Sequence, residues 1–140
     1  GFQGRVAICD FDNNLDHLAY GASDFILMPL SFEPCGLPQM IAPLYGSLPV
    51  AHDTGGIHDT ISDLDVENDA GNGFLFKTLD ANGLFYAINQ AMNFYNLPDR
   101  TKAKQIKRVM TESAAQFTHV ATARQYIELY EKMLKRPLII

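Results

Sequence analysis

Turns that could bind a ligand are concentrated in one stretch of the chain, from Glu33 to Gly56, which reads EPCGLPQMIAPLYGSLPVAHDTGG. The first turn, residues 33–36 and here called the EPCG turn, combines a carboxylate, a proline of fixed φ, a small thiol and a permissive glycine. The second, residues 54–56 and here called the TGG turn, is Thr-Gly-Gly. Each turn precedes a candidate helix, whose free N–H groups suit a phosphate or a hydroxylated ligand. The two turns are therefore the candidate binding site.

Strands and helices alternate around these turns. Short apolar runs predict strands at 5–9, 24–29, 48–51 and 73–76. The run at 24–29 is continuously apolar, which is typical of a parallel strand covered on both faces. Helical spacing of apolar residues predicts helices at 13–20, 37–45, 81–95, 101–115 and 121–134, whereas 57–65 has no clear pattern. Pro43 interrupts the second helix and predicts either a kink or an unusual loop.

This alternation predicts an α/β fold in a single domain over 1–140, with a mostly parallel sheet and flanking helices. In such sheets ligands bind beyond the carboxyl ends of the strands, which here are followed by residues 10–12, 31–36 and 53–56. The chain contains neither a GxGxxG fingerprint nor a GxxxxGKS or GxxxxGKT P-loop. The predicted site therefore belongs to neither of those nucleotide-binding classes.

Composition argues against several kinds of partner. The formal net charge of -5 and the absence of a basic cluster argue against nucleic acid and anionic membranes. No run approaches the roughly 18 consecutive apolar residues of a membrane span. The histidines and cysteines lack metal-ligand spacing, so we expect no metal site and two reduced thiols, Cys9 and Cys35. The first residue, Gly1, fits either a tag remnant or a piece of a longer chain.

Four motifs follow one another along the chain: FEPCGLPQ at 32–39, YGSLPV at 45–50, TGGIHDTI at 54–61 and NGFLF at 72–76. In sequence and in order they resemble the bacterial glycogen synthase and plant starch synthase family. Members of this family are GT-B glycosyltransferases with two Rossmann-like domains. They transfer glucose from a sugar nucleotide, ADP-glucose or UDP-glucose, to the non-reducing end of an α-1,4-glucan with retention of configuration. The resemblance implies that this chain is Rossmann-like, forms the C-terminal part of the second domain and needs no cofactor besides the donor substrate.

The resemblance also implies roles for individual residues. Glu33 would lie against the donor glucose and support the charge that develops at the anomeric carbon. The glucose hydroxyls would be held by the backbone N–H groups of Cys35, Gly36 and Leu37. The residues implied beside the nucleotide are Thr54, Gly55 and Gly56 near the diphosphate, Phe11 against adenine, and Ile41, where related transferases place the second glutamate of an E-x7-E pair.

Several of these residues also have a purely structural interpretation. Glu33 could cap the following helix, Cys35 could be a small packed residue, and Phe11 could cover the sheet. Two positions depart from the family pattern: Ser31 stands where arginine is usual, and His52 stands where a basic residue is usual. Both changes remove positive charge near the expected diphosphate.

The resemblance covers only part of a GT-B enzyme. The chain lacks the KxGGL turn of the first domain and the arginine and lysine that hold the diphosphate at the start of the second. We therefore expect it to supply part of the donor site and to be inactive without the missing N-terminal domain. In the family the last helix, here 119–136, crosses back to that domain. This predicts that Tyr126, Leu129 and Tyr130 are partly exposed and that the fragment self-associates.

The expected location is a bacterial cytoplasm or a plant plastid stroma. Two alternatives of other classes remain open at this point. One is a GT-B transferase for a different sugar nucleotide, and the other is a non-catalytic sugar-nucleotide-binding or regulatory module.

Overall fold

A computed structural model describes residues 4–10 and 12–138 of the chain. The elements follow in the order α1 (Asn13–Ala22), β1 (Phe25–Met28), α2 (Pro38–Ile41), the 3-10 helix η1 (Ala42–Tyr45), β2 (Leu48–His52), α3 (Gly55–Thr60), β3 (Phe74–Phe76), α4 (Ala81–Tyr95), α5 (Asp99–Gln116) and α6 (His119–Leu134). Strands and helices alternate as far as α4, and helices alone follow. This confirms the predicted α/β class.

The three strands form one parallel sheet in the order β1-β2-β3. Phe25 of β1 pairs with Leu48 of β2, and Val50 of β2 pairs with Phe74 of β3. The carboxyl ends of the strands therefore lie at one edge of the sheet, and the EPCG and TGG turns follow at that edge.

The strand predicted at 5–9 is wrong. These residues belong to no strand, and Val6 and Ile8 are 68% and 98% exposed. A strand is stable only where a neighbour pairs its N–H and C=O groups and a layer covers its apolar side chains. In residues 4–10 the apolar side chains meet no such layer, so their β-branched composition alone does not produce a strand.

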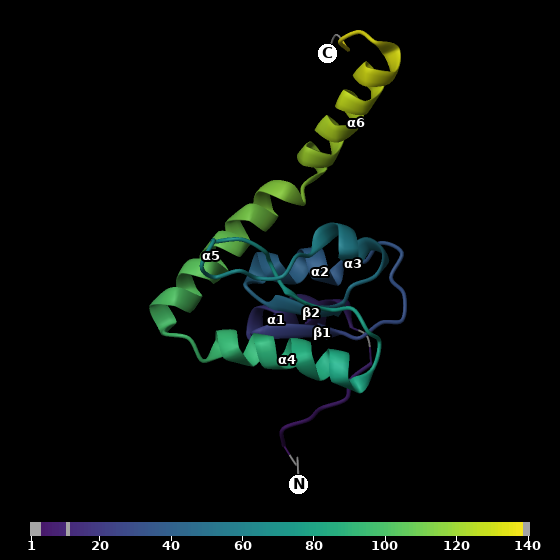
Figure 1. Ribbon diagram of the computed structural model, residues 1–140. Coiled ribbons are helices and arrows are strands. Elements are labelled where there is room, and N and C mark those ends of the chain that lie inside the picture. Colours follow the sequence, from purple (N-terminus) through teal and green to yellow (C-terminus); the bar gives the residue numbers. More distant parts are fainter. Residues whose placement is uncertain (1–3, 11, 139–140) are drawn as a thin grey trace.

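Helices cover both faces of the sheet (Figure 1), so each face has its own apolar cluster. Side chains of β2 alternate between the faces. Leu48 and Val50 join α4 in a cluster with Phe74, Phe76, Ala87, Ala91, Phe94 and Val109. Ala51 points the other way and packs with Met28, Ile57 and Ile61. The core thus fixes the height of α3 above the sheet, and with it the TGG turn.

The prediction that the strand at 24–29 is covered on both faces is wrong in one respect. Leu27 is 57% exposed, although its neighbour Met28 is buried. The reason is that α4 packs against β2 and β3, which leaves the outer part of β1 uncovered on that face.

Side-chain caps mark the starts of two helices, α4 and α6. Asp80 begins α4 because its Oδ1 accepts the Gly83 N–H at 2.7 Å. Thr118 begins α6 in the same way, with Oγ1 accepting the Ala121 N–H at 3.0 Å. The predicted helix at 37–45 is confirmed with the expected interruption, since α2 changes to the 3-10 helix η1 next to Pro43. The helix α3 begins within the TGG turn, at Gly55 and Gly56, and continues through residues 57–60 of the segment 57–65, which has no clear pattern in the sequence.

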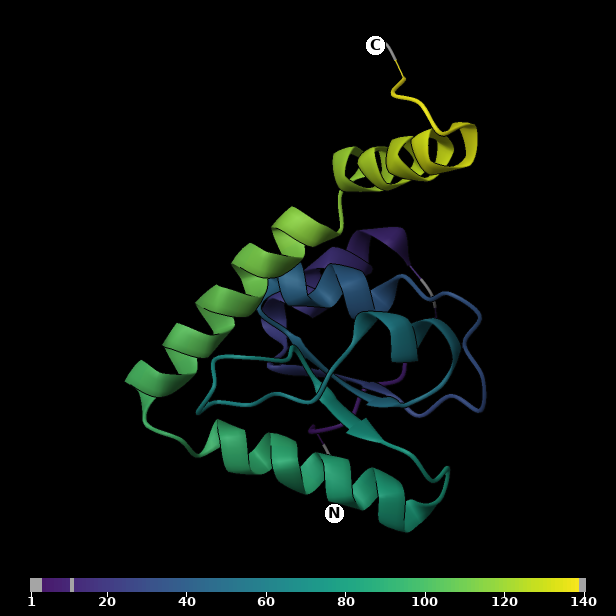
Figure 2. The same cartoon turned by 45° about the horizontal axis from the view of Figure 1, so that its top comes forward.

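The last helix, α6, projects away from the rest of the molecule in both views (Figures 1 and 2). None of its residues is buried, and Tyr126, Leu129 and Tyr130 are each about half exposed. The expected exposure of this apolar face is confirmed. None of the described helices is both long enough and apolar enough to cross a membrane.

Candidate functional site

The EPCG and TGG turns lie against each other at the carboxyl edge of the sheet. They are joined by a backbone hydrogen bond, in which the Gly56 N–H donates to the Glu33 carbonyl oxygen at 2.8 Å. Glu33 and Gly56 are 23 residues apart in the sequence but adjacent in space because β1 and β2 are parallel neighbours. The expectation that they share one edge is therefore met.

The two glycines of the TGG turn make this contact sterically feasible. A Cβ on Gly55 would collide with the carbonyl oxygen of Glu33, and a Cβ on Gly56 would collide with that of Cys35. Gly55 also has a φ of 48°, in the left-handed region that favours glycine. The Thr-Gly-Gly sequence is thus explained by backbone packing against the EPCG turn.

The side chain of Glu33 stays within its own turn. It is half-buried, and Oε1 accepts the Cys35 N–H at a long 3.4 Å. The alternative that Glu33 caps the next helix is wrong, because α2 begins after Leu37 and has no side-chain cap. A carboxylate held by one long hydrogen bond keeps most of its acceptor capacity for another partner.

Several backbone donors at the two turns are unused. Within residues 4–10 and 12–138, the N–H groups of Gly36, Leu37 and Gly55 donate to no other group. Gly36 has a φ of 76° and Leu37 is 62% exposed, so the first turn presents its backbone to solvent. Such donors can bind the oxygen atoms of a sugar or a phosphate without any charged side chain.

His52, at the end of β2, is directed elsewhere. It is 9% exposed, its Nδ1 lies 2.8 Å from the Leu30 carbonyl oxygen, and its ring packs on Phe76 with centroids 5.3 Å apart. The imidazole therefore bridges the ends of β1 and β2. Its described contacts are structural.

A second histidine supplies a titratable group near the TGG turn. His58 Nδ1 lies 2.6 Å from Asp53 Oδ1, and the imidazole is 70% exposed. This hydrogen bond, together with the negative charge of Asp53, raises the pKa of His58 above its ordinary value. The only signal of this pair in the sequence is an aspartate just before the TGG turn and a histidine two residues after it, which is too common a pattern to predict a pairing.

The remaining predicted residues lie in different places. Phe11 is outside the described residues. Ile41 is half-buried in α2 and, with Leu37, lines a groove of about 760 Å³ that reaches the junction of α5 and α6 at Phe117. Cys35 is exposed, and both Cys35 and Cys9 are free thiols.

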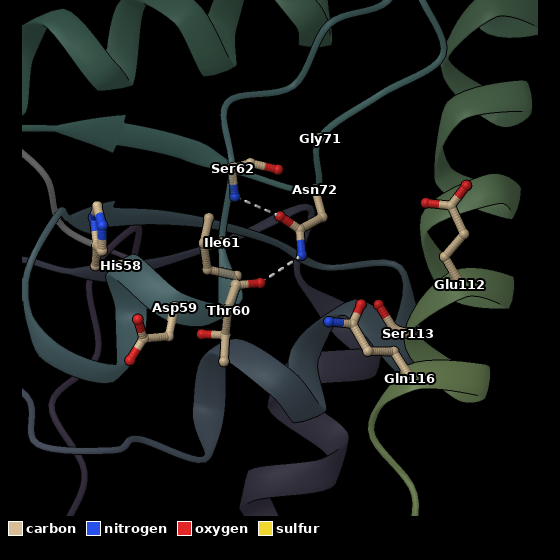
Figure 3. Close-up of a pocket in the computed structure, with 10 residues that line it drawn as sticks. All are labelled: His58, Asp59, Thr60, Ile61, Ser62, Gly71, Asn72, Glu112, Ser113 and Gln116. Atoms are coloured by element: carbon tan, nitrogen blue, oxygen red, sulfur yellow. Dashed lines mark hydrogen bonds between the residues drawn. The ribbon is translucent and has the colours of Figure 1, made fainter. Parts of the chain in front are cut away.

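A separate polar crevice of about 280 Å³ lies between the end of α3 and α5 (Figure 3). Asn72 stands at its centre, where its side chain accepts the Ser62 N–H at 2.9 Å and donates to the Thr60 carbonyl oxygen at 3.0 Å. Glu112, Ser113 and Gln116 face it from α5. Because both ends of the Asn72 amide are paired, this residue explains the loop geometry rather than a ligand site.

No cluster of three or more histidine, cysteine, aspartate or glutamate side chains suited to a metal ion occurs in the described part of the chain. The two turns present the Glu33 carboxylate, the Cys35 thiol, the Thr54 hydroxyl and several backbone N–H groups, and the Asp53–His58 pair lies beside them. Such an arrangement suits a hydroxylated ligand with an anionic portion.

Comparison with known proteins places the chain in context, although no family model matches it. It is 40% identical over 129 residues to the probable starch synthase 4, chloroplastic/amyloplastic, of Arabidopsis thaliana. This match covers 90% of this chain and 12% of that protein. It is 39% identical over 125 residues to the glycogen synthase of Bacillus cytotoxicus, covering 89% of this chain and 25% of that protein. The chain is homologous to a part of the glycogen and starch synthases.

The structural comparison agrees with this relationship. The catalytic domain of starch synthase IV from Arabidopsis thaliana, in a structure described as bound to ADP and acarbose, superimposes with a TM-score of 0.78 at 39% identity. The match covers 92% of this chain and 26% of that one. The resemblance inferred from the four motifs and the GT-B fold class are both confirmed. The chain spans about a quarter or less of the length of these relatives.

Proposed function

We propose that the chain is part of a retaining glucosyltransferase of the glycogen and starch synthase kind. The enzyme would move glucose from ADP-glucose or UDP-glucose to the non-reducing end of an α-1,4-glucan. The observation that carries this proposal is the backbone contact between the EPCG and TGG turns at the carboxyl edge of the sheet. The names of the relatives support it, and so does the ADP in the starch synthase IV structure.

Glu33 and the first turn would bind the donor glucose. The N–H groups of Gly36 and Leu37 are free to donate to sugar hydroxyls, and the long 3.4 Å bond between the Cys35 N–H and Glu33 leaves that donor open to competition. As the glycosidic bond to the nucleotide breaks, positive charge develops at the anomeric carbon, and the Glu33 carboxylate stabilises it electrostatically.

The TGG turn would lie beside the diphosphate. The Gly55 N–H is an available donor, and Thr54 adds a half-buried side chain at the same place. The Gly56 N–H is already bonded to Glu33, so Gly56 contributes by permitting close approach. Phe11 is assigned to adenine and Ile41 to the position of the second glutamate by resemblance alone. We propose no cofactor besides the sugar nucleotide.

The remainder of the site would come from other parts of a longer enzyme. We propose that 1–140 is a partial second domain and that the segment 119–136, with its exposed Tyr126 face, packs on the N-terminal GT-B domain. In the absence of that domain, the same face favours self-association. A plastid stroma or a bacterial cytoplasm fits the plant and bacterial relatives.

The test is glucose transfer by the protein expressed from the complete gene. Incorporation of labelled glucose into glycogen is measured with ADP-glucose and with UDP-glucose, for the wild type and for Glu33→Gln. We expect Glu33→Gln to lower kcat by about 10²–10³-fold, because the amide keeps the shape of the side chain but loses its charge. Glu67→Gln, which neutralises an exposed carboxylate in the loop before β3, is the matched control and should leave the rate unchanged.

Two outcomes would contradict the proposal. Transfer that survives Glu33→Gln would refute the role of Glu33. An absence of transfer from either donor would favour the non-catalytic module. The hydrogen-bond contact between His52 Nδ1 and the Leu30 carbonyl oxygen is consistent with that alternative, because it directs the imidazole into the protein.

A further inference from the structure

A buried polar contact lies beneath the two turns and joins them through side chains. Gln39 is the second residue of α2 and is completely buried. Its Nε2 donates to the Cys35 carbonyl oxygen at 2.7 Å and lies 3.4 Å from Thr60 Oγ1. Thr60 Oγ1 in turn donates to the Gly56 carbonyl oxygen at 2.6 Å. Side chains thus connect the backbone of the EPCG turn to that of the TGG turn.

We propose that Gln39 and Thr60 are positioning residues, which hold the two turns at the spacing that a sugar nucleotide requires. This inference rests on the proposed function. The turns are joined on one side by the Gly56 N–H bond to Glu33, and Gln39 and Thr60 supply a second attachment through Cys35 and Gly56. With two attachments, the backbone donors of Gly36, Leu37 and Gly55 keep fixed relative positions.

The shape of the first turn also depends on Gln39. A Cβ on Gly36 would lie only 2.8 Å from Gln39 Cδ, so the glycine packs directly on the amide group. The left-handed φ of Gly36 and the buried amide are therefore parts of one arrangement, and a change in either moves the backbone that faces the ligand.

A bland interpretation exists for each residue. A threonine hydroxyl commonly bonds to the carbonyl four residues earlier in a helix, and a buried glutamine can simply fill space. The interpretation that Gln39 only fills space is weakened by its Oε1, which is buried without a hydrogen-bond partner among the described residues. The other end of the amide is paired, because Nε2 donates to the Cys35 carbonyl oxygen at 2.7 Å, and an apolar side chain of similar length would leave that buried contact unmade.

The experiment uses Gln39→Met, which keeps the length but removes the amide, together with Thr60→Val and Thr60→Ser. Affinity for ADP-glucose is measured by calorimetry, folding by circular dichroism, and the backbone amides of Gly36, Leu37 and Gly55 by NMR. We expect Gln39→Met and Thr60→Val to weaken binding by about tenfold or more, because small displacements of binding groups are costly. Thr60→Ser keeps the hydroxyl group and should therefore keep the affinity and the amide shifts of the wild type.

The outcomes separate this inference from the proposed function. Folded Gln39→Met that binds ADP-glucose as tightly as the wild type would overturn the inference. If Gln39→Met does not fold, equal affinities of Thr60→Val and Thr60→Ser would overturn it instead. If the wild type binds no sugar nucleotide, the proposed function fails. In that case the positioning role is tested on the ligand-free chain, by the amide shifts of Gly36, Leu37 and Gly55. Identical shifts in Thr60→Val and Thr60→Ser would contradict that role.

Discussion

Replacing Gly56 by alanine tests the packing of the two turns through stability alone. The new Cβ would collide with the Cys35 carbonyl oxygen and would lie 2.6 Å from the Cys35 Cα. Both contacts involve backbone atoms, which cannot turn aside as a flexible side chain would. The EPCG turn must therefore move away from α3, and the 2.8 Å hydrogen bond from the Gly56 N–H to Glu33 lengthens or breaks.

The expected magnitude combines three effects. Overpacking costs about 1–3 kcal/mol, and loss of the hydrogen bond costs about 1 kcal/mol. The higher helix propensity of alanine offsets about 1 kcal/mol, because Gly56 lies in α3. We therefore expect Gly56→Ala to lower the free energy of unfolding by about 1–3 kcal/mol.

Urea denaturation followed by far-ultraviolet circular dichroism measures this change, since the chain has no tryptophan for fluorescence. A loss of this size lowers the urea midpoint by about 1 M. Gly21→Ala is the matched control, because Gly21 also lies in a helix but a Cβ there would meet only Tyr45 Cδ1, at 3.7 Å. It should stabilise the chain by up to about 1 kcal/mol. A Gly56→Ala variant as stable as the wild type would refute the contact between the turns.

Three further predictions concern other polar contacts. Gln105→Leu should destabilise the chain by about 1–3 kcal/mol in the same urea assay, because the buried amide donates to Val66 O and Asp69 Oδ1; an unchanged midpoint would contradict this. The hydrogen bonds from Lys104 and then Gln105 lower the pKa of Asp69, so their contribution to stability is present above about pH 4 and is lost as pH falls through the lowered value. Acid denaturation should show this loss, and Asp69→Asn should remove it. Asp53 raises the pKa of His58. The stability that the His58–Asp53 pair contributes is therefore fully present below about pH 6.5 and is lost as pH rises through the raised pKa. An NMR titration should give His58 a lower pKa in Asp53→Asn, and equal values in both proteins would disprove the pairing.

Much of the fold follows from local patterns in the sequence. The helix predicted at 81–95 has those bounds in the structure, because Asp80 caps it and the buried Ala87 and Ala91 lie on its apolar stripe. The strand β2 was also predicted almost to its ends, since a short apolar run between turn residues has few alternatives.

The differences arise where stability depends on distant residues. Residues 5–9 have the composition of a strand but lack a covering layer, and composition cannot reveal that. Conversely, α3 contains few apolar residues, and it is held in place by Ile57 in the core and by the bond between Gly56 and Glu33. No pattern within 55–60 shows either contact.

The site divides in the same way. The EPCG and TGG motifs identified the two turns, and parallel strand order placed them at one edge. Gln39 was overlooked because a single glutamine in an apolar run resembles a surface residue, whereas here it is buried beneath Gly36. The orientation of the His52 side chain toward Leu30 likewise depends on how β1 and β2 end, which no short motif specifies.

The central claim is that the two turns together bind a sugar nucleotide. The most direct measurement is an NMR titration of the chain with ADP-glucose, in which the backbone amide of every assigned residue is followed. We predict that the largest shifts occur at Gly36, Leu37 and Gly55, whose N–H groups are free. Glucose alone should shift only the first two of these amides. Shifts centred instead on Asn72 and Gln116 in the crevice between α3 and α5, or no shifts at saturating ligand, would contradict the claim.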